Sequence, residues 1–420
     1  MSGASRSALA TSEQVNRDAL LVELLADPAL IEARDRVEQL YLGDPFCGRS
    51  AAGIASAADA AASITAAAVQ HALVSDPSRP AFLWSACAAH AWPGLAVPNS
   101  GYGIDNPDNV HRRTAIDGVS SYRISVQVPP RPAAQFSFIC YGQPEADGPV
   151  TREGAAIASV LLSHQVTPDA EGRFEVTVGP EPVPGSAYHL VSAPTSTWLL
   201  VRDALTDWET QEPLHLEIER IAGPEAPPAQ SRAELVEIAV ANTERLSRYW
   251  LAYNNELLYG PRPANRLPQP VGRPFGASVA APFALGAGEG LLVTLDPGGC
   301  DYLGFEVTDP WGVTRPAVDA LGGLNNRQAL ANPDGTITYW VGPADPGVHN
   351  WLDTGGLDAG LITARWQGGT LDAEAPPVRS TELVPLAEAA DRFGPEHQVS
   401  AQQRADQLRR RAAAFARRLG

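Results

Sequence analysis

The feature that most constrains the fold is a series of short β-rich runs that follow one another without helical segments between them. The first set begins after Pro93 and covers 122–128, 135–141, 173–178, 197–201 and 215–221. Residues 122–128 (YRISVQV) alternate apolar and polar side chains, as a strand with one solvated face does. A second set covers 290–295, 303–307, 336–341 and 360–366. Strands joined without helices favour antiparallel sandwiches or barrels.

Helical signals surround these two sets. Thr11 and Gln14 have the spacing of a capping box, Asp27-Pro28 predicts a helix to about residue 41, and 49–74 is alanine-rich. Ser231 and Glu234 form a second capping-box pattern, which predicts a bridging helix over 231–259. We therefore predict an α+β, mainly β fold with two antiparallel sandwich or jelly-roll-like domains. The expected divisions are helices in 1–94, β domains in 95–225 and 263–375, a linker and bridging helix in 226–262, and an extension in 376–420.

The composition removes several classes of chemistry. All 31 basic residues are arginine, and the formal charge is −17. A chain without lysine forms no Schiff base with pyridoxal phosphate and carries no P-loop lysine. An acidic chain repels phosphate backbones and anionic headgroups, so nucleic acid and membrane surfaces are not expected partners.

Cysteine usage and the absence of targeting signals suggest a cytoplasmic protein. Cys47, Cys87, Cys140 and Cys300 form no CxxC pair, which argues against a zinc knuckle, and we expect four reduced core residues. Residues 1–10 lack the apolar stretch of a signal peptide, and no run of 18 apolar residues predicts a membrane span.

A first polar constellation lies in residues 106–118 (NPDNVHRRTAIDG), ahead of a predicted strand. Amides, carboxylates, a histidine and two arginines within thirteen residues are typical of a loop that orients a substrate. The alternative is a self-capped turn, since Asn and Asp bond their own backbone and Pro107 sets a bend. Both interpretations remain open.

A second constellation lies in residues 345–356, with an Asn325-Asn326-Arg327 element upstream. The stretch from Asn350 to Asp353 places an indole and two polar groups between two predicted strands. Trp351 is expected either to form a pocket wall or to lie in the core with its polar neighbours capping it. These alternatives also stay open.

Four ordered signatures that follow the run 302–309 resemble those of a known family. The order 302–309, LNNRQAL, NPDGTITYWVGPADPG, NWLDTGG and 361–368 is similar to the domain-of-unknown-function twelve-fourteen family, over roughly 290–370. Residues 106–118 resemble an element of the companion twelve-fifty-four domain, although His111 stands near the position where that family prefers Tyr. The resemblance implies two β-rich domains with helical additions, and it carries no settled activity.

We expect an enzyme of hydrolase or lyase type, with a cleft between the two β domains. The two constellations, with the Asn325-Asn326-Arg327 element counted in the second, are expected to meet in this cleft, so that Arg113 and Arg327 bind the same ligand. Acid–base catalysis by His and carboxylates beside arginine clamps is the chemistry that these residues leave available. The expected substrate is small and partly apolar, and an anionic or phosphorylated compound is left open as an alternative. The expected proton-transfer groups are His111 and Asp108. The expected substrate-binding residues are Asn109, Arg112, Arg113, Trp311, Asn326, Arg327, Asn350 and Trp351.

Three further expectations follow. A weaker, metal-assisted variant has Asp105 and Asp108 holding Mg²⁺ against a phosphorylated substrate, without any other cofactor. The alternative to an enzyme is a non-catalytic ligand-binding or accessory protein, since fold does not decide function. The arginine-rich segment 400–419 is interpreted as a solvated terminal helix on the acidic body.

Overall fold

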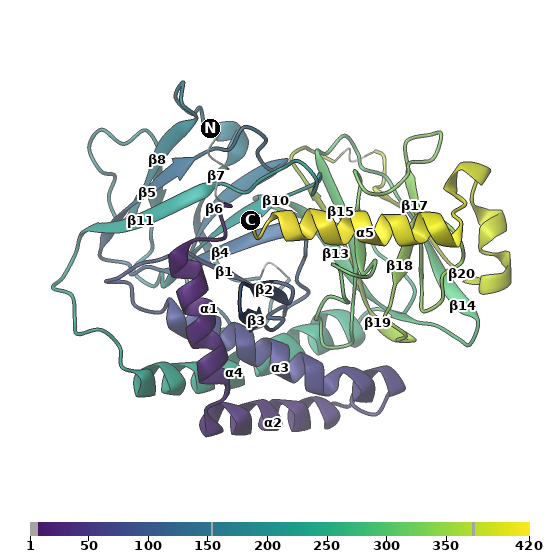
Figure 1. Ribbon diagram of the computed structural model, residues 1–420, viewed down its shortest axis with the longest axis horizontal. Helices are drawn as coiled ribbons and strands as arrows, with labels where there is room; N and C mark the ends of the chain where they lie inside the picture. The colour runs from purple at the N-terminus through teal and green to yellow at the C-terminus, as the bar shows by residue number, and fades with distance from the viewer. Residues whose placement is uncertain (1–6, 153, 372–373) are drawn as a thin grey trace.

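The computed structural model describes residues 7–152, 154–371 and 374–420, and its N-terminal part is helical. Helices α1 (Ser12–Leu25), α2 (Pro28–Leu42) and α3 (Ala51–Leu73) lie together below the sheets (Figure 1). Thr11, Asp27 and Ser50 cap their first turns through side-chain oxygens that accept backbone N–H groups. The three helices were predicted, each within about two residues.

The first β unit contains two sheets that pack face to face. One sheet has the order β1-β4-β10-β6-β7 and the other the order β11-β5-β8-β9. The strands are β1 (Leu83–Ser85), β4 (Asn109–Ala115), β5 (Ser121–Gln127), β6 (Gln135–Tyr141), β7 (Ile157–Leu162), β8 (Arg173–Gly179), β9 (His189–Val191), β10 (Trp198–Ala204) and β11 (His215–Ala222), beside a separate hairpin of β2 (His90–Trp92) and β3 (Leu95–Val97).

Helix α4 (Arg232–Tyr253) bridges the two units, as predicted. Ser231 and Glu234 form the capping box at its start, and a π-helical turn continues it over Asn254–Tyr259. Helix α4 packs along α3 and α2 (Figure 1). The helical layer thus combines segments that precede and follow the first β unit in the chain.

The second β unit repeats this design. Its sheets have the orders β12-β13-β19-β15-β16 and β20-β14-β17-β18. The strands are β12 (Val271–Arg273), β13 (Gly276–Ala284), β14 (Glu289–Leu295), β15 (Tyr302–Thr308), β16 (Gly323–Asn325), β17 (Ile337–Gly342), β18 (Trp351–Asp353), β19 (Ala359–Gln367) and β20 (Val378–Pro385).

The two units have the same topology. Replacing β1 and β4–β11 by β12–β20 in chain order converts the sheet orders of the first unit into those of the second. Each unit also has a single parallel pair among its described strands, β8 with β9 and β17 with β18, in an otherwise antiparallel arrangement. The fold is thus α+β, mainly β, with two equivalent sandwiches.

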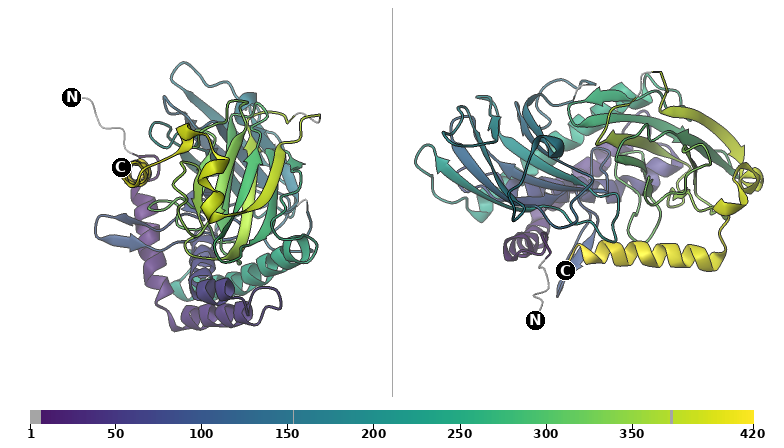
Figure 2. Two further views of the ribbon diagram at one scale, coloured as in Figure 1. Left: turned by 90° about the vertical axis from the view of Figure 1, so that its right-hand side faces the viewer. Right: turned by 90° about the horizontal axis from the view of Figure 1, so that it is seen from above.

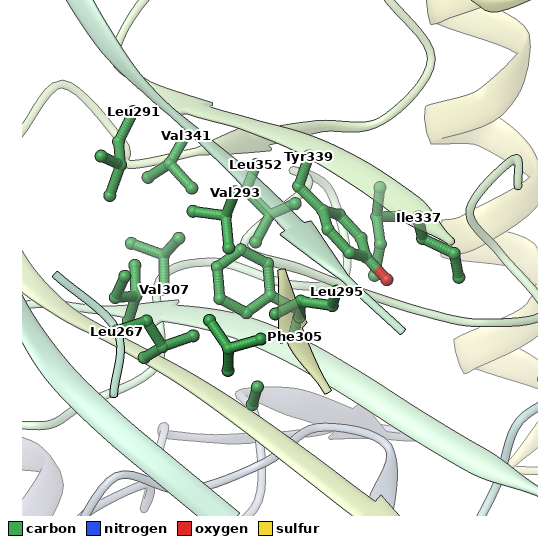
Figure 3. Packing of buried hydrophobic residues seen from close by; sticks show 14 of the residues in the cluster. Leu267, Leu291, Val293, Leu295, Phe305, Val307, Ile337, Tyr339, Val341 and Leu352 are labelled. Carbon is green, nitrogen blue, oxygen red and sulfur yellow. The ribbon is translucent and has the colours of Figure 1, made fainter. Parts of the chain in front are cut away.

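Each sandwich has its own apolar core. Phe138 and Val201 from one sheet meet Ile124 and Val176 from the other in the first unit. In the second unit, Phe305 packs against side chains of the facing sheet, where Tyr339 lies at a ring-centroid distance of 4.9 Å (Figure 3). Because each core is filled by one face of each sheet, the outer faces of the five-stranded sheets remain available to form an interface.

The C-terminal helix α5 (Ala401–Arg417) lies across both units (Figures 1 and 2). Arg404, Arg411 and Arg418 are spaced by seven residues and are buried, whereas Arg409 and Arg410 are exposed. The buried arginines contact Asp345, Gln328 and the Pro107 carbonyl, respectively. The interpretation of α5 as a solvated helix is therefore wrong on one face, because that face fastens the two units together.

Three segments differ from the predicted divisions. The constellation at 106–118 contains strand β4 rather than only a loop or turn. The segment after Pro377, expected to be exposed, contains β20, which pairs with β14. Strand β1, inside the predicted helical region, pairs with β4.

The cysteine prediction is confirmed in that all four thiols are buried and free. Helix α3 is long and apolar enough to cross a membrane, yet 72% of its most apolar window is buried inside the fold. It packs against α4 and α2, as a core helix does. The first six residues, on which the signal-peptide expectation partly rests, lie outside the described residues.

Candidate functional site

A cavity of about 310 Å³ lies between the two five-stranded sheets, and side chains of α4 line part of it. Strand alternation aims side chains into it. On β4, Asn109, His111 and Arg113 line the cavity, while Val110 and Arg112 point to the opposite face. Strands β6, β10, β13 and β19 contribute further residues to the lining. The predicted cleft between the β units thus exists as a geometric feature.

The cavity wall is basic and aromatic, although the chain is acidic. Its described lining includes six arginines, one histidine and two carboxylates, Asp105 and Glu145. Burial raises the pKa of Asp105 to about 6, against the lowering effect of its bonds to Thr314 and of Arg365. The arginines are Arg113, Arg152, Arg202, Arg262, Arg273 and Arg365, and the aromatic residues are Tyr102, Tyr141, Trp198, Tyr249, Trp250, Tyr253 and Phe275.

Only some of these arginines have a carboxylate partner among the described residues. Arg113 forms an ion pair with Glu145, and Arg365 donates to Glu306 at 2.7 Å. No described carboxylate lies within 4.0 Å of the guanidinium nitrogens of Arg202, which is the cationic residue opposite His111 in the sheet. An uncompensated guanidinium inside a cavity attracts an anion.

Flat side chains hold Arg202 in place. Its Nη2 donates to the Tyr141 hydroxyl at 3.2 Å, and its guanidinium carbon lies 4.5 Å from the centre of the Phe275 ring. Tyr141 in turn stacks on Trp198 at 3.7 Å, and Arg113 covers the other face of that indole at 4.1 Å. The Nε of Arg202 is buried and has no described hydrogen-bond partner. The guanidinium is thus oriented, and one of its donors is unused.

His111 lies half-buried on β4, between Ser85 of β1 and Arg202 of β10. Burial is the main cause that holds the pKa of His111 well below its usual range, and Arg202 and Arg365 act in the same direction. The imidazole is therefore neutral at pH 7. It makes no hydrogen bond with the described side chains or backbone, so its ring nitrogens are free for a ligand.

A second polar network, which the sequence did not suggest, forms another part of the wall. The Tyr102 hydroxyl donates to Glu145 at 2.8 Å and lies 3.1 Å from Nε2 of His71. Burial, helped by Arg113 and Arg245, holds the pKa of His71 well below its usual range. A neutral imidazole next to a tyrosine and a carboxylate has the chemistry to relay a proton.

Asp108 does not line the cavity. Its carboxylate is buried between the units and accepts from Trp208 Nε1 at 2.7 Å, the Tyr302 hydroxyl at 2.9 Å and Asn325 Nδ2 at 3.0 Å. Burial raises its pKa, whereas Arg411, Tyr302 and the other neighbours lower it. Because its oxygens are engaged in this way, Asp108 links the two sandwiches, and we do not retain it as a candidate proton-transfer group.

The two constellations therefore meet, but not as expected. Asp108 of the first contacts Asn325 of the second, whereas Arg327 is exposed and does not line the cavity that contains Arg113. The Asn325 side chain accepts from the backbone of Arg327, in a turn that directs Arg327 to solvent. The expected sharing of one ligand by Arg113 and Arg327 does not fit this placement.

Most other predicted residues of the second unit have structural contacts. Asn350 is fully buried and bonds the backbone of Leu330 in both directions. Asn326 bonds the backbone of Leu303. Trp351 donates to the Gly342 carbonyl and packs beneath the guanidinium of Arg404 from α5. These contacts agree with a structural anchor rather than a pocket wall.

Two more of the predicted substrate-binding residues, Arg112 of the first unit and Trp311 of the second, do not line the cavity. Arg112 points away from the cavity and forms a buried ion pair with Asp203, and Trp311 stacks on Tyr41 of α2 at 4.6 Å. Asp105 lines the cavity and accepts from the Thr314 backbone. Within the described ranges, no group of three or more His, Cys, Asp or Glu side chains is arranged to hold a metal ion, and Asp108 does not line the cavity with Asp105.

Two cavity arginines that sequence reasoning missed lie within strands. Arg202 follows the predicted run 197–201 by one residue, and Arg365 is the single charged residue in the apolar strand β19. A charge at an alternating position of an otherwise buried strand is the signal that points to them.

Comparison with known proteins supports the fold alone. No family model matches the chain, and no curated protein matches it. The solved structure of an uncharacterized protein from Burkholderia cenocepacia is similar, with a TM-score of 0.68 and 23% identity, covering 87% of this chain and 99% of that one. A protein from Vibrio parahaemolyticus has a TM-score of 0.42 and 8% identity, over 67% of this chain and 90% of that one.

Proposed function

We propose that the protein binds a small, partly apolar organic anion in the cavity between its two β units. The observation that carries the proposal is Arg202, an oriented guanidinium that lacks a described carboxylate partner and faces a neutral His111. The aromatic wall would cover the apolar part of the ligand, and a charge-assisted pair contributes about 1.5–3 kcal/mol to its affinity. A carboxylate is the ligand group that a planar guanidinium matches best.

We further propose acid–base chemistry of the hydrolase or lyase type, with His111 as the proton-transfer group. A neutral imidazole can accept a proton from water or from a substrate carbon, while Arg202 and Arg365 stabilise the negative charge that develops. An anion bound beside the ring would also offset the two guanidinium charges and so raise the basicity of His111. This step rests on the free ring nitrogens described above.

The family resemblance of residues 290–370, a cytoplasmic location and a small-molecule partner stay proposals. The duplicated sandwich agrees with the two β-rich domains that the resemblance implies. It does not bear on the reaction.

The test is metabolite profiling of the pure protein in a cell extract, by mass spectrometry of consumed and retained compounds. Wild type, His111→Ala and Arg202→Gln are compared, with Arg266→Gln as an exposed control outside the cavity. We expect retention of an organic anion by wild type and its loss in Arg202→Gln.

The two functions separate in the same experiment. An enzyme requires that a compound is consumed by wild type and by Arg266→Gln but not by His111→Ala. Retention of the anion by wild type, His111→Ala and Arg266→Gln without consumption would support a non-catalytic binding protein. Retention by Arg202→Gln would contradict the proposed site.

A further inference from the structure

Three guanidinium groups from three separate segments surround the outer part of the cavity. Arg152 lies in the connection from β6 to β7, Arg262 follows the π-helical turn, and Arg273 ends β12. Arg152 is exposed, and the other two are half-buried. We call these residues the arginine rim, as distinct from the interior residues Arg202, Arg365 and His111.

The members of the rim are close to one another. Arg273 donates to the backbone carbonyl of Arg152, and a side chain at Gly154 would lie 3.7 Å from Nη1 of Arg273. The charge of Arg152 disfavours the cationic form of Arg262, whose pKa is lowered chiefly by burial. Like charges brought together cost free energy unless an anion lies between them.

The charge of the rim is not compensated by its described neighbours. No described carboxylate lies within 4.0 Å of the three guanidinium groups, whereas Arg113 and Arg365 inside the cavity each have one. Arg262 bonds the carbonyl of Ala280, and this contact orients the group without neutralising it. Tyr253 and Phe275 line the cavity beside the rim and offer apolar contact to the part of a ligand that lies deeper.

We propose that the arginine rim binds a phosphate monoester, so that the ligand is a phosphorylated compound whose apolar or aromatic part enters the cavity. A phosphate monoester has up to two negative charges and three free acceptor oxygens. It therefore matches several converging guanidinium groups better than a single carboxylate does. The inference deepens the proposed function, since it assigns the chemical class of the same ligand.

The test compares 2-phenylethyl phosphate with 2-phenylethanol by isothermal titration calorimetry. Wild type is expected to bind the ester at least about tenfold more tightly than the alcohol, because each charge-assisted bond is worth about tenfold or more. Arg262→Gln and Arg273→Gln should each lose about tenfold in affinity for the ester and leave the alcohol unchanged. Arg266→Gln, on the same segment but outside the cavity, should bind as wild type does.

Equal affinities for ester and alcohol, or wild-type affinity for the ester in both rim variants, would overturn the inference. Arg152→Gln, at an exposed position, keeps the test available if Arg262→Gln does not fold. Phenylacetate, titrated in parallel, separates the two proposals. If phenylacetate binds and its binding depends on Arg202, but the ester binds no more tightly than the alcohol, only the rim inference is refuted. If the ester preference depends on the rim arginines but phenylacetate does not bind through Arg202, only the interior anion site is refuted.

Discussion

The buried ion pair between Arg112 and Asp203 allows a quantitative test of the structural role assigned to Arg112. The two side chains are 4% and 0% exposed, and Arg112 also donates to the Leu214 carbonyl, while Asp203 accepts from the Leu214 N–H. Replacing Arg112 by Met leaves an uncompensated carboxylate in the core of the first sandwich. We expect this to lower the free energy of unfolding by about 3–5 kcal/mol. For 420 residues that unfold together, this corresponds to a fall in Tm of about 3–6 °C.

The assay is urea and thermal unfolding followed by circular dichroism and tryptophan fluorescence. Arg36 and Glu244 provide the control pair, since they lie 2.8 Å apart with 52% and 45% of their side chains exposed. Arg36→Met should cost at most about 1 kcal/mol. In the double variant Arg112→Met/Asp203→Leu the loss should be smaller than the sum of the single losses, because the lone charge is removed. A loss below about 1 kcal/mol for Arg112→Met would refute the reasoning.

Three further predictions concern pH, the C-terminal helix and packing. Burial raises the pKa of Glu306 from 4.5 to about 8. Ionisation of Glu306 therefore opposes folding, and the free energy of unfolding should fall as the pH rises through this range. Glu306→Gln should flatten the fall in Tm between about pH 5 and pH 8.5. Arg411→Gln should cost about 1–3 kcal/mol of unfolding free energy in urea, because Arg411 is buried, while Arg410→Gln at an exposed position should have little effect; equal effects would contradict the fastening role of α5. A Cβ at Gly290 would lie 2.1 Å from the Trp340 ring, so Gly290→Ala should lower Tm through overpacking. An unchanged Tm would contradict the tight packing of Gly290 against Trp340.

The regular strands and capped helices were open to prediction because local chemistry decides them. Strand β6 matches its predicted bounds of Gln135–Tyr141, and the capping box at Ser231 marks the start of α4. Strand β4 was missed because neither face shows the usual apolar alternation. Its polar residues at 109, 111 and 113 face a cavity, and Arg112 on the core side is buried through an ion pair.

The site was predictable only in part. The three polar side chains of β4 that line the cavity all belong to the predicted set, and the expected meeting of the two constellations occurs at Asp108 and Asn325. Arg202, Arg365 and the arginine rim come from strands and connections far apart in the chain, and only the folded structure brings them together. Asn350 and Trp351 looked functional because buried amides and indoles need partners, which here are backbone groups of the same unit.

The central claim is that the cavity selects an organic anion through Arg202. The most direct measurement is the affinity of a panel of aromatic carboxylates (benzoate, phenylacetate and cinnamate) against the corresponding amides, by isothermal titration calorimetry of wild type and Arg202→Gln. We predict that at least one carboxylate binds wild type at least about tenfold more tightly than its amide, and that Arg202→Gln removes this preference without a change in Tm of more than a few degrees. Equal affinities for acid and amide across the panel, or a preference that survives Arg202→Gln, would contradict the account.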